Sequence, residues 1–263
     1  HAAADDGPYI IQLTPRRYEA LWVCDGKVER EEHRTRRKTI TIAPRCGYER
    51  PAVLPAHLAD AESVPYDGGR IVALSDIHGQ YALMVKLLRA HRVIDGNDDW
   101  ALGRDHLVIT GDVFDRGDKV NEVFWLLFQL QQQADAAGGA VHFLLGNHET
   151  MVLYDDLRYV NPKYVEVARL LGRPYSALYG ADTVIGGWLR TRPVMLKLGD
   201  TLFLHGGIAP ENLDLVTGIH ATNAAYRGSL GTAKDTVKAD PATSRLYDGK
   251  RSPIWYRGYF NGE

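Results

Sequence analysis

The fold is decided by three polar runs, 75-SDIHG-79, 111-GDVFDRG-117 and 146-GNHE-149, each of which follows a short apolar run. The apolar runs are IVAL at 71–74, LVIT at 107–110 and VHFLL at 141–145. Short apolar runs that are rich in β-branched residues and bounded by turn residues are typical of buried strands. Each predicted strand therefore delivers polar residues at its carboxyl end.

Two helices are predicted between these strands. Apolar residues recur at three and four positions from Gln80 to His91 and again from Lys119 to Ala137, which is the period of an amphipathic helix. Strands that alternate with helices pair in parallel, and their following loops gather at one edge of the sheet. Open α/β sheets bind ligands at that edge, so we expect the functional site there.

The side chains at this edge are typical of a metal site. Asp76 and His78 are two residues apart in a segment expected to be extended, so both point the same way and can bind one ion. The carboxylate of Asp112 has two oxygens and can bridge two ions. Asn147 and His205 offer an oxygen and a nitrogen to the second ion. This mixture of ligands suits manganese, iron or zinc better than magnesium or calcium, which prefer oxygen.

The motifs resemble those of a known family. The runs DIHG, GDVFDRG, GNHE and HGG, which end at Gly207, are similar to the signature of the phosphoprotein phosphatases, which are calcineurin-like metallophosphoesterases. The runs DGPY at 6–9 and WYRG at 255–258 are similar to the bacterial Shewanella-like branch, which includes cold-active protein tyrosine phosphatases. The resemblance implies an α/β fold of the α+β sandwich type, with a β-sandwich flanked by helices and, here, an amino-terminal β-hairpin extension.

The resemblance also implies a mechanism. A hydroxide that bridges two divalent ions would attack the phosphorus of a phosphomonoester in line. Arg116 and Arg257 are expected to bind phosphate oxygens, with Asn147 and His148 as further substrate-binding residues. His148 would protonate the leaving oxygen while Asp115 accepts a hydrogen bond from its ring and raises its pKa. For Arg257 the alternative is a solvated arginine beside an aromatic core plug.

Three functions are compatible with these residues. The first is a protein phosphatase that acts on a phosphorylated protein or peptide and releases phosphate, with phosphotyrosine preferred because some members of the branch prefer it. The second is a small-molecule phosphoesterase, such as a dinucleoside polyphosphate hydrolase. The third is a non-catalytic metal-binding or interaction module.

The third function follows from one departure from the family. In relatives, the second ion takes another histidine after the arginine that Arg257 matches, whereas the last histidine of this chain is His220, which comes too early in the order. We therefore expect a shortened form that also lacks a strand of the sandwich, or a water in place of the histidine.

Composition narrows the class of protein. The chain has 263 residues, of which 45% are hydrophobic, and a formal net charge of −2, so it can bury a large core and is not expected to bind nucleic acid or an anionic membrane. No apolar run approaches the roughly 18–20 residues of a membrane span. The start HAAA at residues 1–4 is compatible with a processed, periplasmic or secreted protein, with a cytoplasmic protein as the alternative. Cys24 and Cys46 either form a disulfide or remain free thiols.

We expect a β-rich extension and linker over residues 1–65 and a catalytic domain over 66–263. Turn residues at 25–26 indicate a hairpin, and prolines from Pro51 onward indicate a linker with a helical turn at 56–61. The remaining predicted elements are helices at 150–155, 162–171, 177–189 and 217–228, a hairpin at 193–198 and 201–205, and a loop at 231–250. His142 is expected inside a strand, and His91 and His106 on the surface. Five tyrosines are expected in the core or at the rim of the site, with stacking on an aromatic substrate as the alternative: Tyr154, Tyr159, Tyr164, Tyr175 and Tyr179.

Overall fold

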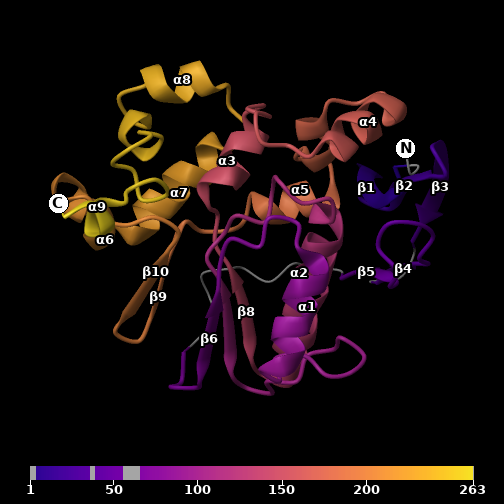
Figure 1. Ribbon diagram of the computed structural model, residues 1–263, viewed down its shortest axis with the longest axis horizontal. Coiled ribbons are helices and arrows are strands. Elements are labelled where there is room, and N and C mark those ends of the chain that lie inside the picture. The colour runs from indigo at the N-terminus through magenta and orange to yellow at the C-terminus, as the bar shows by residue number, and fades with distance from the viewer. Residues whose placement is uncertain (1–3, 36–38, 56–65, 263) are drawn as a thin grey trace.

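The centre of the fold is a parallel three-stranded sheet. The computed structural model describes residues 4–35, 39–55 and 66–262, and in it the strands β6 (Ile71–Leu74), β7 (His106–Ile109) and β8 (Ala140–Phe143) pair in the order β6-β7-β8 (Figure 1). The helices α1 (Tyr81–Ala90) and α2 (Val120–Ala137) connect them. The predicted strand and helix order is confirmed, and each predicted boundary lies within two residues of the observed one.

A second, smaller sheet packs against the first. The strands β9 (Met195–Leu198) and β10 (Thr201–Leu204) form an antiparallel hairpin, as predicted. Val108 of β7 and Leu144 after β8 are buried together with Leu198, and Leu196 and Phe203 pack on this cluster. The two sheets therefore enclose an apolar layer, which is the arrangement expected of a sandwich.

The amino-terminal extension forms an antiparallel sheet of its own. It contains β1 (Asp6–Thr14), β2 (Arg17–Cys24) and β3 (Lys27–Arg34). Asp25 and Gly26, between β2 and β3, have φ angles of 50° and 70°, as a tight hairpin turn requires. The extension also bonds to the rest of the chain, because the indole of Trp125 donates to the carbonyl oxygen of Pro8 at 2.9 Å. Cys24 and Cys46 form a disulfide with a Cα–Cα distance of 5.7 Å.

The prediction of a continuous linker from Pro51 is wrong. The short strand β5 (Ala52–Leu54) pairs antiparallel with β4 (Ile40–Ile42). Prolines flank β5 at positions 51 and 55, and a strand of three residues between prolines has no recognisable period. The helical turn expected at 56–61 lies outside the described residues, and the division of the chain after residue 65 stays a prediction.

The segment after the third polar run is helical, as predicted, with one correction. The helices α3 (Asn147–Leu153) and α4 (Pro162–Leu171) form. The single helix expected at 177–189 is instead a 3-10 helix (Tyr175–Tyr179) followed by α5 (Val184–Leu189). Thr183 caps α5, since its hydroxyl accepts the N–H of Gly186 at 3.1 Å, and this cap requires the chain to leave the preceding helix.

The carboxyl-terminal part contains more helix than the sequence predicts. The helices α6 (Leu213–Thr217) and α7 (Ile219–Ser229) precede α8 (Lys234–Ala239), which lies inside the expected loop at 231–250. A 3-10 turn (Ser244–Leu246) follows, and α9 (Gly258–Asn261) is the last helix described. The sequence does not predict α8, because this helix has six residues and buries only Val237.

The interior is built around α2, which is covered on nearly all sides.

His142 is buried, as predicted, and its Nε2 lies 3.0 Å from Nδ1 of His106. The expectation that His106 lies on the surface is wrong, because β7 begins one residue earlier than predicted and His106 stacks on His142. His91 is exposed, as predicted.

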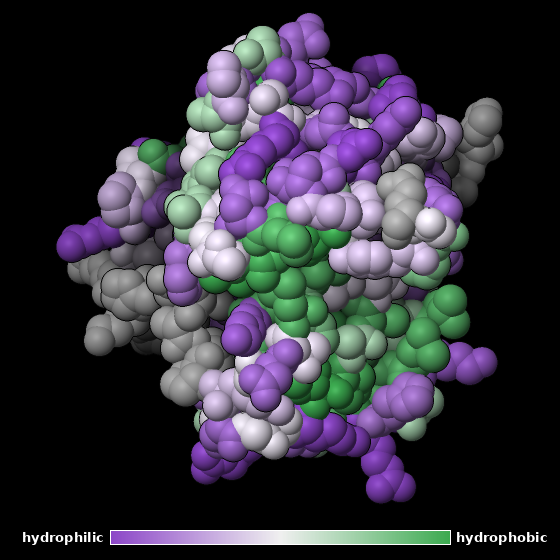
Figure 2. Space-filling model, turned by 90° about the vertical axis from the view of Figure 1, so that its left-hand side faces the viewer, coloured by the Kyte–Doolittle hydropathy of each residue, from purple (hydrophilic) through white to green (hydrophobic). Residues whose placement is uncertain are grey.

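The surface near α6 and α9 carries exposed apolar side chains. Figure 2 shows the side of the molecule where these helices and β10 lie, and hydrophobic side chains gather in the middle of that face. Leu213 and Phe260 are 62% and 85% exposed.

None of the helices in the described part of the chain has the length and apolar character needed to span a membrane.

Candidate metal centre

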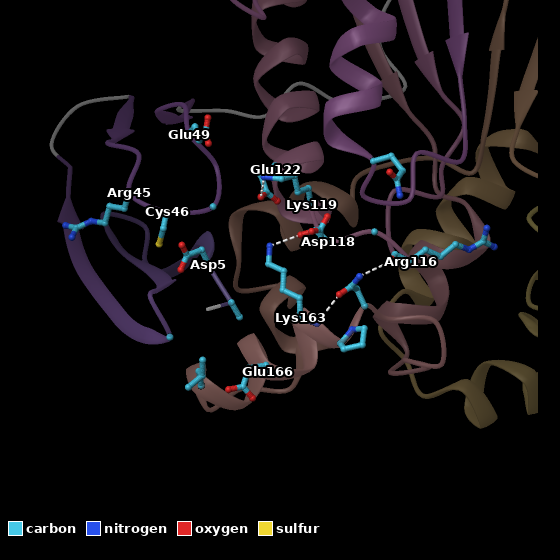
Figure 3. Close-up of a pocket in the computed structure, with 18 residues that line it drawn as sticks. Asp5, Arg45, Cys46, Glu49, Arg116, Asp118, Lys119, Glu122, Lys163 and Glu166 are labelled. Carbon is cyan, nitrogen blue, oxygen red and sulfur yellow. Dashed lines mark hydrogen bonds and ion pairs between the residues drawn. The ribbon is translucent and has the colours of Figure 1, made fainter. Parts of the chain in front are cut away.

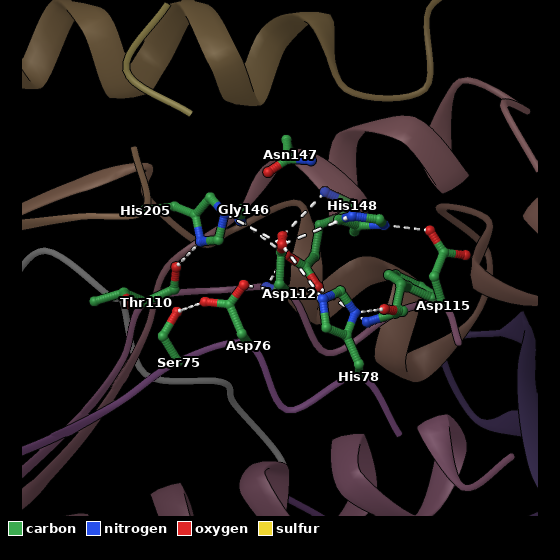
Figure 4. Close-up of polar contacts among 12 residues, drawn as sticks. Ser75, Asp76, His78, Thr110, Asp112, Asp115, Gly146, Asn147, His148 and His205 are labelled. Carbon is green, nitrogen blue, oxygen red and sulfur yellow. Dashed lines mark hydrogen bonds and ion pairs between the residues drawn. The ribbon is translucent and has the colours of Figure 1, made fainter. Parts of the chain in front are cut away.

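The predicted ligands meet at one edge of the two sheets. Asp76 and His78 follow β6, Asp112 follows β7, Asn147 begins α3 after β8, and His205 follows β10 (Figure 4). The expectation that Asp76 and His78 lie in an extended segment is wrong, since their φ angles are 53° and 45°. The chain turns sharply at both residues, and the turns bring their side chains to Asp112.

Asp112 lies at the centre of two groups of donor atoms. The groups are His78, Asp112 and His148, and Asp76, Asp112 and His205, and within each group the donor atoms lie within 4.8 Å of one another. Oδ2 of Asp112 is 3.8 Å from Nε2 of His78 and 3.2 Å from Nε2 of His205. A carboxylate shared by two groups is the arrangement expected of a residue that bridges two ions.

The two predicted histidine ligands are oriented by backbone carbonyls. Nδ1 of His78 bonds to the carbonyl oxygen of Phe114 at 2.7 Å, and Nδ1 of His205 to that of Thr110 at 2.8 Å. Each Nε2 atom then faces Asp112 and is the nitrogen left to bind an ion, as in metal-binding histidines. Burial lowers the pKa of His78, which favours the neutral form that binds metal.

The donor set fits two divalent ions. Nε2 of His78 is buried and has no hydrogen-bond partner within the part of the chain that the structure describes. A buried nitrogen without a partner is costly unless something binds it. Oxygen and imidazole donors around a shared carboxylate are suited to manganese, iron or zinc.

Glu149 holds the ligand loops together, a role that the sequence did not reveal. Its side chain is fully buried and accepts the N–H groups of Asp112 and Gly146 at 2.8 and 2.7 Å and of Val113 at 2.8 Å. Burial, reinforced by the charge of Asp112, raises the pKa of Glu149. An acidic residue three positions after the N-cap residue, here Gly146, is a capping-box signal, but here the carboxylate also reaches the loop after β7.

Close packing of the same two loops requires glycine at position 146. A Cβ atom there would overlap Oδ1 of Asp112 and approach the Glu149 carboxylate at 3.0 Å. Asn147, His148 and Glu149 then occupy three successive positions in the first turn of α3, all buried. One helical turn therefore carries a predicted ligand, a predicted acid and the residue that holds the loops.

His148 and Asp115 form the pair that the sequence predicts. Nδ1 of His148 lies 2.5 Å from Oδ2 of Asp115, and Nε2 lies 3.9 Å from Oδ2 of Asp112. Burial lowers the pKa of His148, but the hydrogen bond to Asp115 and the charges of Asp112, Asp115 and Glu149 together outweigh it, so the net pKa is raised. The imidazole therefore presents Nε2 to the centre while Asp115 fixes its other nitrogen.

Arg116 lines a cavity, and its charge is close enough to His78 to help lower the pKa of that residue. The cavity has a volume of about 1280 Å³, and its lining includes Arg116, Lys119, Glu122 and Lys163. In Figure 3 the guanidinium of Arg116 extends away from this cavity. The backbone N–H of Arg116 donates to the carbonyl oxygen of Tyr159 at 2.9 Å, which fixes the start of the side chain.

Arg257 also reaches the centre. Its Nη2 lies 3.3 Å from Nε2 of His205, and the side chain is partly buried. Asn147 is buried, and in the view of Figure 4 it lies above Asp112 between His205 and His148. His220 is exposed on α7 and belongs to neither donor group.

Comparison with known proteins assigns the class. The family model for calcineurin-like phosphoesterases matches residues 69–235, a span that contains every predicted ligand. The chain belongs to the calcineurin-like phosphoesterase family, whose members use a dimetal centre. It is 34% identical over 144 residues to Shewanella-like protein phosphatase 1 of Plasmodium berghei, covering 53% of this chain and 39% of that protein.

Further relatives place the chain more closely within the family. It is 27% identical over 232 residues to Shewanella-like protein phosphatase 2 of Arabidopsis thaliana, covering 72% of this chain and 58% of that protein. The crystal structure of a cold-active protein tyrosine phosphatase of a psychrophilic Shewanella species superposes with a TM-score of 0.89 at 41% identity, over 97% of this chain and 77% of that one. The chain thus spans only 39% and 58% of these two curated relatives.

Proposed function

We propose that the protein is a metal-dependent phosphomonoesterase that acts on phosphorylated proteins or peptides, with phosphotyrosine as the preferred residue. The observation that carries the proposal is the carboxylate of Asp112, which two groups of donor atoms share. A symmetric pair of ions about 3.5–4 Å apart is the usual clamp for an in-line displacement at phosphorus.

The residues of the site have separable tasks in this proposal. Asp76, His78, Asp112, Asn147 and His205 would hold two divalent ions, which supply charge stabilisation and a nucleophile formed from water at neutral pH. Arg116 and Arg257 bind phosphate oxygens and offset the charge that develops in the transition state.

The leaving group is the task of the His148–Asp115 pair. His148 carries a proton on Nε2 and donates it to the leaving oxygen. Asp115 stabilises the imidazolium through Nδ1, at the observed 2.5 Å. Because the proton is held on the side that faces Asp112, it is delivered where the phosphate binds.

The relatives support a protein substrate, and one of them supports an alternative. The Shewanella structure is named a protein tyrosine phosphatase, which favours phosphotyrosine. A symmetrical bis(5'-nucleosyl)-tetraphosphatase of Chromobacterium violaceum is 32% identical over 148 residues, covering 54% of this chain and 44% of that protein. Hydrolysis of dinucleoside polyphosphates is therefore the second candidate.

The test is metal analysis combined with hydrolysis of three substrates. The wild-type protein should bind two ions and hydrolyse a phosphotyrosine peptide faster than a phosphoserine peptide or diadenosine tetraphosphate. Asp112→Asn should lose bound metal and at least about a hundredfold in activity. Asp200→Asn, which removes an exposed carboxylate from the β9–β10 turn, should change neither.

Each other outcome contradicts part of the proposal. Fastest turnover of diadenosine tetraphosphate would replace the protein substrate with the second candidate. Two bound ions without hydrolysis of any substrate would make the protein a metal-binding module, and unchanged metal content in Asp112→Asn would remove the proposed centre.

A further inference from the structure

Tyr159 is placed beside the proposed acid and is open to solvent. Its ring centroid lies 5.5 Å from that of His148, with an angle of 53° between the rings. Of the five tyrosines between positions 154 and 179, three are buried in the core, whereas Tyr159 is 48% exposed. An exposed aromatic face next to a buried catalytic histidine is available to a substrate.

The backbone of Tyr159 is fixed to the phosphate-binding loop. Its carbonyl oxygen accepts the N–H of Arg116 at 2.9 Å, and the side-chain amide of Asn161 donates to the carbonyl oxygen of Arg116 at 2.8 Å. Two hydrogen bonds thus tie the segment between α3 and α4 to the loop that follows β7. The backbone that carries the ring of Tyr159 therefore keeps its position relative to the backbone of Arg116.

The ring itself is held from one side. The guanidinium carbon of Arg158 lies 5.4 Å from the centroid of Tyr159. Arg158 makes two hydrogen bonds to Asp156, at 2.7 and 2.9 Å, and Asp156 also accepts a bond from Lys234 at 2.7 Å. This charged chain, which runs to α8, positions Arg158 against the ring.

The position of the ring matches the position of a leaving group. A leaving oxygen that takes a proton from Nε2 of His148 contacts an imidazole whose centroid is 5.5 Å from that of Tyr159. In an aryl phosphate the aromatic ring is bonded directly to that oxygen, so it lies within reach of Tyr159. The β-carbon of phosphoserine occupies the same place and offers no aromatic face to stack.

We propose that Tyr159 is a platform for the aromatic ring of the substrate and favours phosphotyrosine over phosphoserine. The proposal rests on the proposed function for its substrate class, and it deepens that function by assigning the preference to one side chain. Tyr159 acts on the leaving group by stacking and takes no part in proton transfer.

The test uses binding as well as turnover. Benzylphosphonate and ethylphosphonate, in which a CH₂ group replaces the leaving oxygen, are titrated into the metal-loaded protein by calorimetry. The wild type should bind benzylphosphonate roughly 3- to 10-fold more tightly than ethylphosphonate, the range expected of one aromatic pair. Tyr159→Phe should keep this ratio, and Tyr159→Leu, which keeps apolar bulk without an aromatic face, should reduce it to below about twofold.

A matched control shows whether the effect is specific to position 159 or follows from the loss of any tyrosine. Tyr18 is partly exposed on β2, and its hydroxyl accepts a bond from Gln12 at 3.3 Å, so Tyr18→Leu should leave the ratio unchanged. In turnover, Tyr159→Leu should lower kcat/KM for a phosphotyrosine peptide by roughly 3- to 10-fold and leave that for a phosphoserine peptide within about twofold.

Two results would overturn the proposal. The platform is absent if Tyr159→Leu keeps the preference for benzylphosphonate. Equal losses for both phosphonates would show that Tyr159 only shields His148 from water. Because the phosphonates are not hydrolysed, the binding ratio decides the matter even if the wild-type protein turns over neither peptide, a result that would refute the proposed function alone.

Discussion

The carboxylate of Glu149 accepts the backbone N–H of Asp112 at 2.8 Å. This bond fixes the residue that both donor groups share, although Glu149 itself is not among the predicted ligands. We expect Glu149→Gln to lower the free energy of unfolding by about 2–3 kcal/mol, because one amide N–H₂ group would face backbone donors in a buried site. Metal affinity should fall about 10- to 100-fold.

Urea denaturation with and without metal, together with metal titration, measures both effects. Glu166→Gln is the control, since Glu166 is exposed on α4 and paired with Arg169. If Glu149→Gln lowered stability and left metal affinity unchanged, Glu149 would be a structural residue without influence on the centre.

His148 has two possible roles, as a general acid and as a metal ligand, and a substitution distinguishes them. The structure places its Nε2 in a donor group with His78 and Asp112, so both roles are geometrically open. As a general acid, His148→Asn should lower turnover by about 10²–10⁴-fold on phosphates with poor leaving groups, far less on good ones, and leave metal content unchanged.

A series of substituted phenyl phosphates, with metal analysis of the same samples, makes this measurement. The acid role would be refuted by parallel losses of metal and turnover that do not depend on the leaving group. Asp115→Asn should shift the dependence on leaving group in the same direction, because it removes the charge that stabilises the imidazolium.

The buried pair of His106 and His142 predicts how stability depends on pH. Burial, together with His106 and Arg192, lowers the pKa of His142 to about 4. The unfolded chain takes up this proton near pH 6.5, so the contribution to stability is complete above about pH 6.5 and is lost as pH falls toward 4. The loss should be about 2 kcal/mol between pH 7 and pH 5.

Urea denaturation in the presence of a chelator at several pH values tests this dependence on pH. The free energy of unfolding of His142→Gln should fall less on acidification than that of the wild type. Burial raises the pKa of Glu122 to about 7, which acts in the opposite direction but equally in both proteins, so the difference between them reports His142. His91→Gln, an exposed control, should follow the wild type. Parallel curves for wild type and His142→Gln would contradict the prediction.

The ligand loops could be predicted from sequence because their signal is local. Glycine-bounded polar runs after apolar strands place Asp76, Asp112 and Asn147 at one sheet edge without knowledge of any tertiary contact. The task of Glu149 could not be predicted in this way, and neither could the choice of Tyr159 among the five tyrosines. Glu149 bonds to backbone groups some 35 residues earlier in the chain, and Tyr159 depends on Arg158 and on a bond to Arg116, neither of which has a periodic signature.

The errors in secondary structure have the same origin. The expected helix at 177–189 breaks because Thr183 caps α5, and a threonine inside an apolar period is easily read as helix interior. The sequence predicts His106 on the surface because only His142 alternates with apolar neighbours, and the stacking of the two rings is a contact between different strands. Short elements such as α8 and β5 are stabilised by packing that the sequence does not show.

The orientation of α3 sets the positions of three residues of the centre at the same time. Asn147, His148 and Glu149 leave the helix about 100° apart, toward the rim of the centre, Asp115 and the loop of Asp112 respectively. A rotation of α3 about its axis would move all three side chains away from their partners. Met151 and Val152 are buried beneath this turn, so substitutions there act on the whole centre together. In evolution, one of the three residues can change independently of the other two only if the rotation of α3 about its axis is preserved.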